Sequence, residues 1–152
     1  MNHDRYDDAY IADILARTKT IALVGASANP ARPSYGVMQF LIGKGYELYP
    51  VNPGHAGGQI LGRPVYARLA DVPVAIDMVD VFRASDAVAG LVGEALALDP
   101  LPGAIWTQLG VRDDAAAARA EAAGIEVVMN RCPKIEFFRL GDMIAQRAGG
   151  AE

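Results

Sequence analysis

The chain has 152 residues, of which 52% are hydrophobic and 21% charged, and its formal net charge is −4 at pH 7. This length predicts a single domain, residues 1–152, that folds without a disulfide or a structural metal. The acidic balance argues against a general nucleic-acid-binding protein, which needs a basic surface to displace counterions from phosphates. It leaves room for one local basic pocket that binds a small anion.

Cysteine and histidine are scarce: Cys132 is the only cysteine, and His3 and His55 are the only histidines. One cysteine excludes an internal disulfide framework and a multi-cysteine zinc site. The N-terminus carries acids where a secretory signal has bases and then an apolar run. No apolar stretch approaches the roughly 20 residues that span a bilayer. We therefore expect a soluble, cytoplasmic protein without a membrane partner.

The N-terminal residues, 7–18, have apolar side chains at helical spacing and acids in the first turn, so they predict a helix. Short apolar runs follow, each typical of a strand buried on both faces of a parallel sheet. The predicted strands cover residues 20–24, 46–51, 75–81, 103–106 and 125–129.

Helical patterns lie between most of these strands, at residues 34–44, 85–96 and 114–123, and a last helix is predicted at 136–147. Ser34, Ser85 and Asp113 are expected to cap the first three of these helices. Residues 52–73 are irregular, with a short strand expected near 64–66, and residues 148–152 are expected to fray. Alternating strands and helices predict an α/β fold built from βαβ units.

Ligands of an open α/β sheet bind beyond the carboxyl ends of its strands. The segments that follow the five predicted strands are small, polar or basic, and contain no histidine, aspartate or glutamate. They cover residues 25–36, 52–54, 82–83, 107–110 and 130–133. This set of residues suits an anion and lacks groups for acid–base catalysis.

Gly25 directly follows the first strand, and small residues and a helix come next. This order brings a pyrophosphate onto backbone N–H groups. It is not the dinucleotide fingerprint, because Ser27 and Pro30 replace the other two glycines and the acid expected about 20 residues further on is missing. The plain alternative is a βα turn whose helix is capped by Ser34.

Arg32 and Arg83 are predicted at the same edge, where guanidinium groups hold phosphates. The alternative for each is a solvated surface arginine. Cys132 fits a small buried thiol better than a nucleophile, because no histidine is expected nearby. A mixed disulfide with a ligand thiol is the other interpretation of this cysteine. Asp77 and Asp80 are three apart in a strand, so they face opposite sides and form no carboxylate pair.

Six motifs, in this order, resemble the stand-alone CoA-binding domain proteins: residues 24–30 (VGASANP), 32–37 (RPSYGV), 49–53 (YPVNP), 77–83 (DMVDVFR), 106–111 (WTQLGV) and 127–134 (VVMNRCPK). The resemblance covers roughly residues 18–140 and extends to the CoA-binding domain of the succinyl-CoA synthetase α subunit. It implies a Rossmann-like, doubly wound sheet of about five mainly parallel strands, with helices on both faces and coenzyme A across the strand ends.

The resemblance also implies which residues hold coenzyme A or an acyl-CoA. The phosphates would lie near Gly25, Ala26, Ser27, Asn29, Arg32, Ser34 and Tyr35. The adenosine and nucleotide would lie near Val51, Asn52, Pro53, Phe82 and Arg83. The pantetheine would extend toward Trp106, Gln108 and Gly110, with Asn130 and Cys132 at the last strand end. Without the resemblance, Trp106 fits the core or a pocket wall, and the two asparagines Asn29 and Asn130 fit loop backbone partners.

The 152 residues contain no domain with a phosphorylated histidine and no ATP-grasp domain, so acyl-CoA ligase activity is not implied. We expect binding of coenzyme A without catalysis, and a homodimer or another protein as further partner. Two alternatives stay open. One is an enzyme, either an NAD(P)-dependent oxidoreductase or a CoA-dependent transferase. The other is a regulatory subunit with a vestigial nucleotide pocket.

Overall fold

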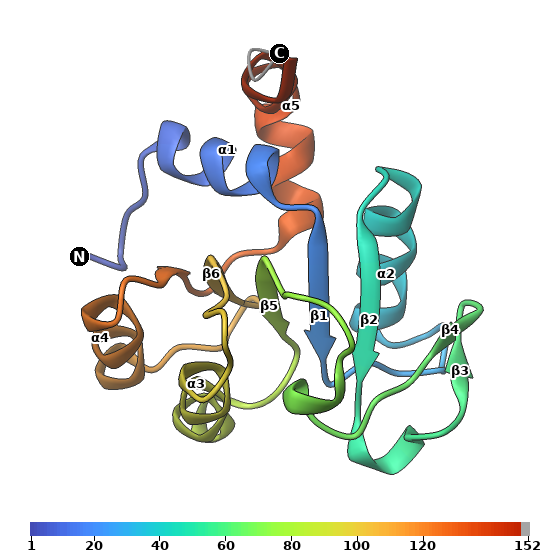
Figure 1. Ribbon diagram of the computed structural model, residues 1–152. Coiled ribbons are helices and arrows are strands. Elements are labelled where there is room, and N and C mark those ends of the chain that lie inside the picture. The colour runs from blue at the N-terminus through green and yellow to red at the C-terminus, as the bar shows by residue number, and fades with distance from the viewer. Residues whose placement is uncertain (150–152) are drawn as a thin grey trace.

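The computed structural model describes residues 1–149 and confirms a five-stranded parallel sheet (Figure 1). Its strands lie in the order β2-β1-β5-β6-β7, and every neighbouring pair is parallel. Their bounds are β1 (Thr20–Val24), β2 (Glu47–Val51), β5 (Met78–Val81), β6 (Ala104–Thr107) and β7 (Glu126–Val128). Only β5 departs clearly from its predicted bounds. It begins at Met78, and the side chain of Asp77 just before it accepts the N–H groups of Lys19 and Thr20.

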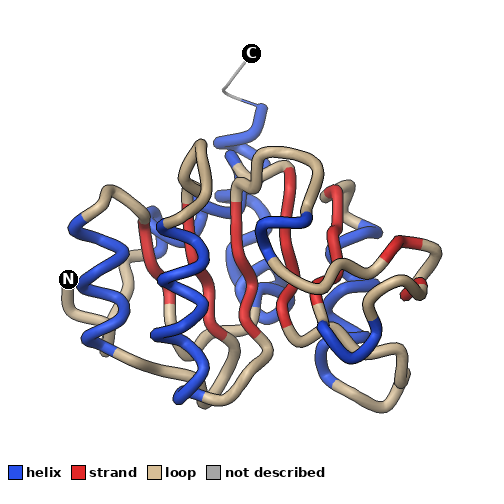
Figure 2. The backbone as a smooth tube through the Cα atoms, turned by 60° about the horizontal axis from the view of Figure 1, so that its bottom comes forward, coloured by secondary structure: helices blue, strands red, loops and turns tan. Residues whose placement is uncertain are grey.

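Helices cover both faces of the sheet, as expected (Figure 2). Helices α1 (Asp8–Arg17), α2 (Pro33–Gly43) and α5 (Pro133–Gly149) share one core with the first face of the sheet. Helices α3 (Val88–Leu96) and α4 (Asp114–Ala122) share a second core with the opposite face. The continuous apolar runs of the strands therefore follow from burial on both sides.

Helix capping was predicted correctly at one of three positions. Asp113 accepts the N–H of Ala116 at 3.0 Å and caps α4. The prediction that Ser34 caps α2 was wrong, because Pro33 occupies the first helical position and Arg32 is the N-cap. Ser85 was also wrong: it opens a 3₁₀ turn before α3, and its hydroxyl accepts the N–H of Arg112.

The irregular segment after β2 contains a 3₁₀ turn (Pro53–His55), a hairpin of β3 (Gln59–Ile60) and β4 (Arg63–Pro64), and a second 3₁₀ turn (Leu69–Asp71). The expected short strand lies one residue early, at β4, and Tyr66 forms an isolated bridge with Val51. Helix α5 begins three residues before its predicted start and bends at Leu140. Of the residues expected to fray, 148 and 149 are helical and 150–152 lie outside the described residues. Within residues 1–149, every helix is too short or too polar to cross a membrane.

Strand β7 is an edge strand of the sheet, and two tyrosines of the N-terminal segment hydrogen-bond to its free side. The Tyr10 hydroxyl donates to the carbonyl of Val127 at 2.9 Å and accepts its N–H at 3.0 Å. The Tyr6 hydroxyl accepts the N–H of Met129 at 2.8 Å. These bonds satisfy edge groups that another chain would otherwise pair with.

The sheet order creates a crevice at one position. From β1 the chain passes to β2 on one side, and the next strand of the sheet, β5, lies on the other side of β1. The loops that leave β1 and β5 therefore diverge at the carboxyl ends of these strands. Ligands of open α/β sheets bind at such a switch point.

Candidate functional site

A cavity of about 490 Å³ lies at this switch point. It is bordered by the loop after β1, the start of α2, the turn after β2, and the segments after β5 and β6. Its lining residues are Gly25, Ala26, Ser27, Arg32, Pro33, Ser34, Asn52, His55, Phe82, Arg83, Ala84, Gln108 and Val111. We call it the strand-end cavity. Nine of the residues predicted to bind the ligand line it.

Gly25 shapes the mouth of the cavity. Its φ is +87°, and a Cβ at this position would lie 2.4 Å from the carbonyl oxygen of Phe82. The Gly25 N–H donates to Val51 and the Phe82 N–H donates to Val24, so both loops are held to the strand ends. Only a residue without a side chain lets the two loops approach this closely.

The loop after Gly25 is ordered by its own side chains. The Ser27 hydroxyl accepts the N–H of Asn29, and the Asn29 side chain accepts the N–H of Ala31, both at 3.0 Å. Within residues 1–149, the N–H groups of Ala26, Ser27 and Ala28 have no acceptor. Three successive unpaired amides form a site for an anion.

The charge at the cavity is positive. Arg32 and Arg83 are exposed at its rim, and neither pairs with a carboxylate in the described part of the chain. No aspartate or glutamate is among the described residues that line it. The local field therefore favours an anionic ligand although the chain is acidic.

Two side-chain amides in the cavity wall, those of Asn52 and Gln108, differ in their hydrogen bonding. The Asn52 side chain is hydrogen-bonded through both its nitrogen and its oxygen, because it donates to the carbonyl of Ala26 at 2.8 Å and accepts the N–H of Gly54 at 2.9 Å. The Gln108 side-chain oxygen is buried and has no partner among the described residues. Leaving a buried acceptor unpaired is costly, so Gln108 suits a ligand with an N–H or O–H donor.

Eight predicted residues do not line the strand-end cavity: Asn29, Tyr35, Val51, Pro53, Trp106, Gly110, Asn130 and Cys132. Pro53 borders an adjoining cavity of about 360 Å³ that shares Gly25, Asn52, Phe82 and Arg83.

Three of these residues, Trp106, Asn130 and Cys132, have structural roles in the fold. Trp106 is fully buried, and its indole N–H donates to the carbonyl of Arg131. Asn130 accepts the N–H of Gly110 at 2.7 Å, and Cys132 is a buried thiol at the start of α5.

Four lining residues were missed by sequence reasoning: Pro33, His55, Ala84 and Val111. Pro33 lies within the predicted segment 25–36 but was not singled out as a contact. Ala84 and Val111 directly follow the predicted segments 82–83 and 107–110, so slightly longer segments would have included these two. His55 enters because the turn that begins at Asn52 folds back toward the sheet.

Asp80 lies in β5, two residues before Phe82, and is fully buried. Neither oxygen of its side chain has a hydrogen-bond partner among the described residues. Burial raises the pKa of the Asp80 carboxyl to about 8. The side chain is not part of the cavity lining, so it belongs to the core beneath the site.

The family model of the CoA binding domain matches residues 19–137. The chain belongs to the CoA binding domain family. This span contains every residue that lines the strand-end cavity.

Proteins similar to this chain occur in a bacterium and an archaeon. YneT of Bacillus subtilis is 36% identical over 128 residues, covering 84% of this chain and 91% of YneT. A solved structure from Pyrococcus horikoshii superposes with a TM-score of 0.84 at 36% identity, covering 92% and 96% of the two chains.

A segment of this chain also resembles part of a larger protein. The alpha subunit of the ADP-forming acetate–CoA ligase I of Pyrococcus furiosus is 39% identical over 70 residues. That match covers 43% of this chain and 15% of the ligase subunit.

Proposed function

We propose that this CoA binding domain holds coenzyme A or an acyl-CoA in the strand-end cavity and performs no reaction on it. The observation that carries the proposal is the row of unpaired amides from Ala26 to Ala28, flanked by the unpaired guanidinium groups of Arg32 and Arg83. Phosphate groups are the part of coenzyme A that such a cradle binds.

The remaining lining residues fit the rest of the ligand. The unpaired oxygen of Gln108 can accept a hydrogen bond from an amide N–H, of which pantetheine has two. Residues 51–53, at the end of β2, carry no acid, so nothing there repels the 3′-phosphate of coenzyme A. An NAD ribose would lack its usual carboxylate partner at the same position.

His55 supports a second candidate, a CoA-dependent enzyme. Its imidazole lines the cavity and is the one side chain there that commonly transfers protons near neutral pH. Among the described residues no group hydrogen-bonds this imidazole, whereas catalytic histidines are usually oriented by a partner. Non-catalytic binding therefore remains our proposal, and incubation with acetyl-CoA distinguishes the two. Release of free thiol that is lost in His55→Ala would establish the enzyme.

Isothermal titration with coenzyme A, dephospho-CoA and NAD tests the binding itself. We expect one site for coenzyme A, weaker binding of dephospho-CoA, and no heat with NAD. Tighter binding of NAD would favour the oxidoreductase, and negligible heats with all three would favour a vestigial pocket.

The arginines provide the matched variants for this titration. Arg32→Ala and Arg83→Ala should each weaken coenzyme A binding by about tenfold at low salt, and less at high salt. Arg68→Ala is the control, because Arg68 is exposed and lies outside the cavity lining. Equal affinities for all three variants would contradict the proposed site.

A further inference from the structure

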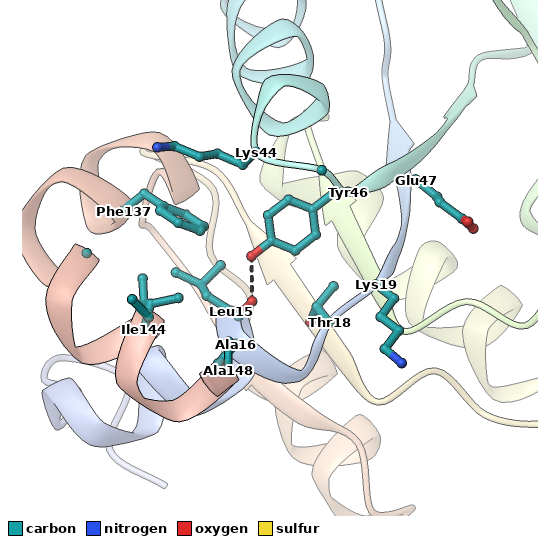
Figure 3. A pocket seen from close by; sticks show the side chains of 13 residues that line it. Leu15, Ala16, Thr18, Lys19, Lys44, Tyr46, Glu47, Phe137, Ile144 and Ala148 are labelled. Atoms are coloured by element: carbon teal, nitrogen blue, oxygen red, sulfur yellow. Dashed lines mark hydrogen bonds between the residues drawn. The ribbon is translucent and has the colours of Figure 1, made fainter. Parts of the chain in front are cut away.

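A cleft larger than the strand-end cavity lies away from it, at the amino ends of β1 and β2. It has a volume of about 670 Å³ and lies between the end of α1, the end of α2, the start of β2 and the second half of α5 (Figure 3). We call it the rear cleft. It shares no lining residue with the strand-end cavity.

The shape of the rear cleft depends on the bend in α5. Leu140 has φ −118° and ψ 17°, which are not helical values, and Gly141 follows it. Beyond this bend Gly141 and Ile144 line the cleft, and Phe137 lines it from before the bend. The bent helix thus lines one side of the cleft, from Phe137 to Ala148.

The walls of the rear cleft are mainly apolar. They include Leu15, Phe137 and Ile144, and the alanines at positions 16, 145 and 148. The Tyr46 ring also borders the cleft, while its hydroxyl donates to the carbonyl of Leu15 (Figure 3). The Thr18 hydroxyl donates to Ile14 at 2.6 Å. Because these polar groups are already paired, the walls suit an apolar body.

Two ammonium groups flank these apolar walls. Lys44 lies at one side, with its Nζ 5.5 Å and 5.6 Å from the ring centroids of Phe40 and Phe137. Lys19 lies at the other side, and within residues 1–149 neither lysine pairs with a carboxylate. Glu47 is the one carboxylate in the described lining, and Figure 3 shows it pointing away from Phe137.

From this combination we propose that the rear cleft is a second ligand site, which binds a small amphipathic anion with an aromatic or short aliphatic body and one carboxylate or sulfonate group. The apolar walls take the body, and the lysines attract the charge. The proposal is independent of coenzyme A binding, since the two sites have no residue in common.

Two fluorescent probes of similar size test both parts of the proposal. The anionic probe is 8-anilinonaphthalene-1-sulfonate, and the neutral one is N-phenyl-1-naphthylamine. We expect both to bind the full chain at one site, with the anion bound more tightly at low salt. Ala145→Phe should abolish binding of both probes, because it fills the cleft from an exposed helical position. Ala118→Phe, at an exposed position of α4, is the matched control.

The charge is tested with Lys44→Gln. The substitution should lower the affinity for the anionic probe by roughly two- to fivefold and leave the affinity for the neutral probe unchanged. Lys134→Gln is its control, because this lysine also lies over the Phe40 ring but outside the cleft lining. Circular dichroism melts verify folding, and Ala148→Phe replaces Ala145→Phe should that variant unfold.

The outcomes separate clearly. The proposal is supported if Ala145→Phe binds neither probe and Lys44→Gln has a lower affinity for the anionic probe alone. Equal binding by Ala145→Phe and Ala118→Phe places the probe elsewhere and overturns it. An equal effect of Lys44→Gln on both probes overturns the preference for an anion.

Discussion

Asn52, at the end of β2, holds the carbonyl of Ala26, in the loop after β1, through a hydrogen bond of 2.8 Å. The same side chain accepts the N–H of Gly54 at 2.9 Å. One side-chain amide therefore holds the loop after β1 against the turn after β2. Preorganised amides bind an anion without an ordering cost at the moment of binding.

Replacing Asn52 by alanine should loosen this loop. We expect coenzyme A to bind about three- to tenfold more weakly, since one or two hydrogen bonds worth about 1 kcal/mol each are lost. The melting temperature should fall only slightly. Titration calorimetry measures the affinity, and Asn2→Ala, a distant asparagine with one local hydrogen bond, serves as the control. Unchanged affinity in Asn52→Ala would show that the loop is ordered without this residue.

Gly25→Ala should destabilise the fold strongly. The new Cβ would lie 2.4 Å from the carbonyl oxygen of Phe82, in a backbone conformation with φ +87° that alanine disfavours. We expect a loss of about 2–4 kcal/mol, measured by denaturant unfolding. Gly90→Ala is the control, because no heavy atom lies within 4 Å of a Cβ there and α3 favours alanine. A Gly25→Ala variant as stable as Gly90→Ala would contradict the close approach of the two loops.

Asp80 makes stability depend on pH. Its pKa is raised from 3.8 to about 8 in the folded state, because the carboxyl is fully buried. Below about pH 4 the Asp80 carboxyl is protonated in both the folded and the unfolded chain, so it does not make the free energy of unfolding depend on pH. Between about pH 4 and pH 8 the unfolded chain releases the proton while the folded chain keeps it, and stability falls as pH rises.

The variant Asp80→Asn isolates this effect. Its melting temperature relative to the natural chain should increase steadily from pH 4 to pH 8. Asp86→Asn, at an exposed position, should show a constant difference over the same range. Parallel curves for Asp80→Asn and the natural chain would mean that the Asp80 carboxyl is ionised in the fold.

Tyr10→Phe tests how the sheet edge is protected. The variant keeps the ring but leaves both the N–H and the carbonyl of Val127 without their partner. We expect a loss of about 1–3 kcal/mol and a melting temperature several degrees lower. Tyr66→Phe is the control, since the Tyr66 hydroxyl has no hydrogen-bond partner among the described residues. Equal melting temperatures would show that solvent replaces the tyrosine at this edge.

The strands were predictable because they are buried on both faces. Each is mainly apolar and is followed by polar or small residues, as in Thr20–Val24 before Gly25. The helix caps were less predictable. Ser34 has the right side chain for a cap, but Pro33 begins the helix one residue earlier. The bend at Leu140 has no local sequence signal beyond Gly141, and it follows from the packing of α5 across two other helices.

The candidate site was predictable where residues directly follow a strand. Gly25, Arg83 and Gln108 line the cavity because the carboxyl ends of β1, β5 and β6 meet at one edge. Residues further along each segment could not be placed in this way. His55 reaches the cavity through a 3₁₀ turn, and the rear cleft joins elements that are far apart in the sequence.

Backbone NMR with added coenzyme A tests the central claim most directly, because it reports on the unpaired amides themselves. The account predicts that the largest changes in ¹H–¹⁵N shift occur at Ala26, Ser27 and Ala28, while Gly45 and Gly141 of the rear cleft stay unchanged. A ligand that shifts other amides while these three remain in place would contradict it.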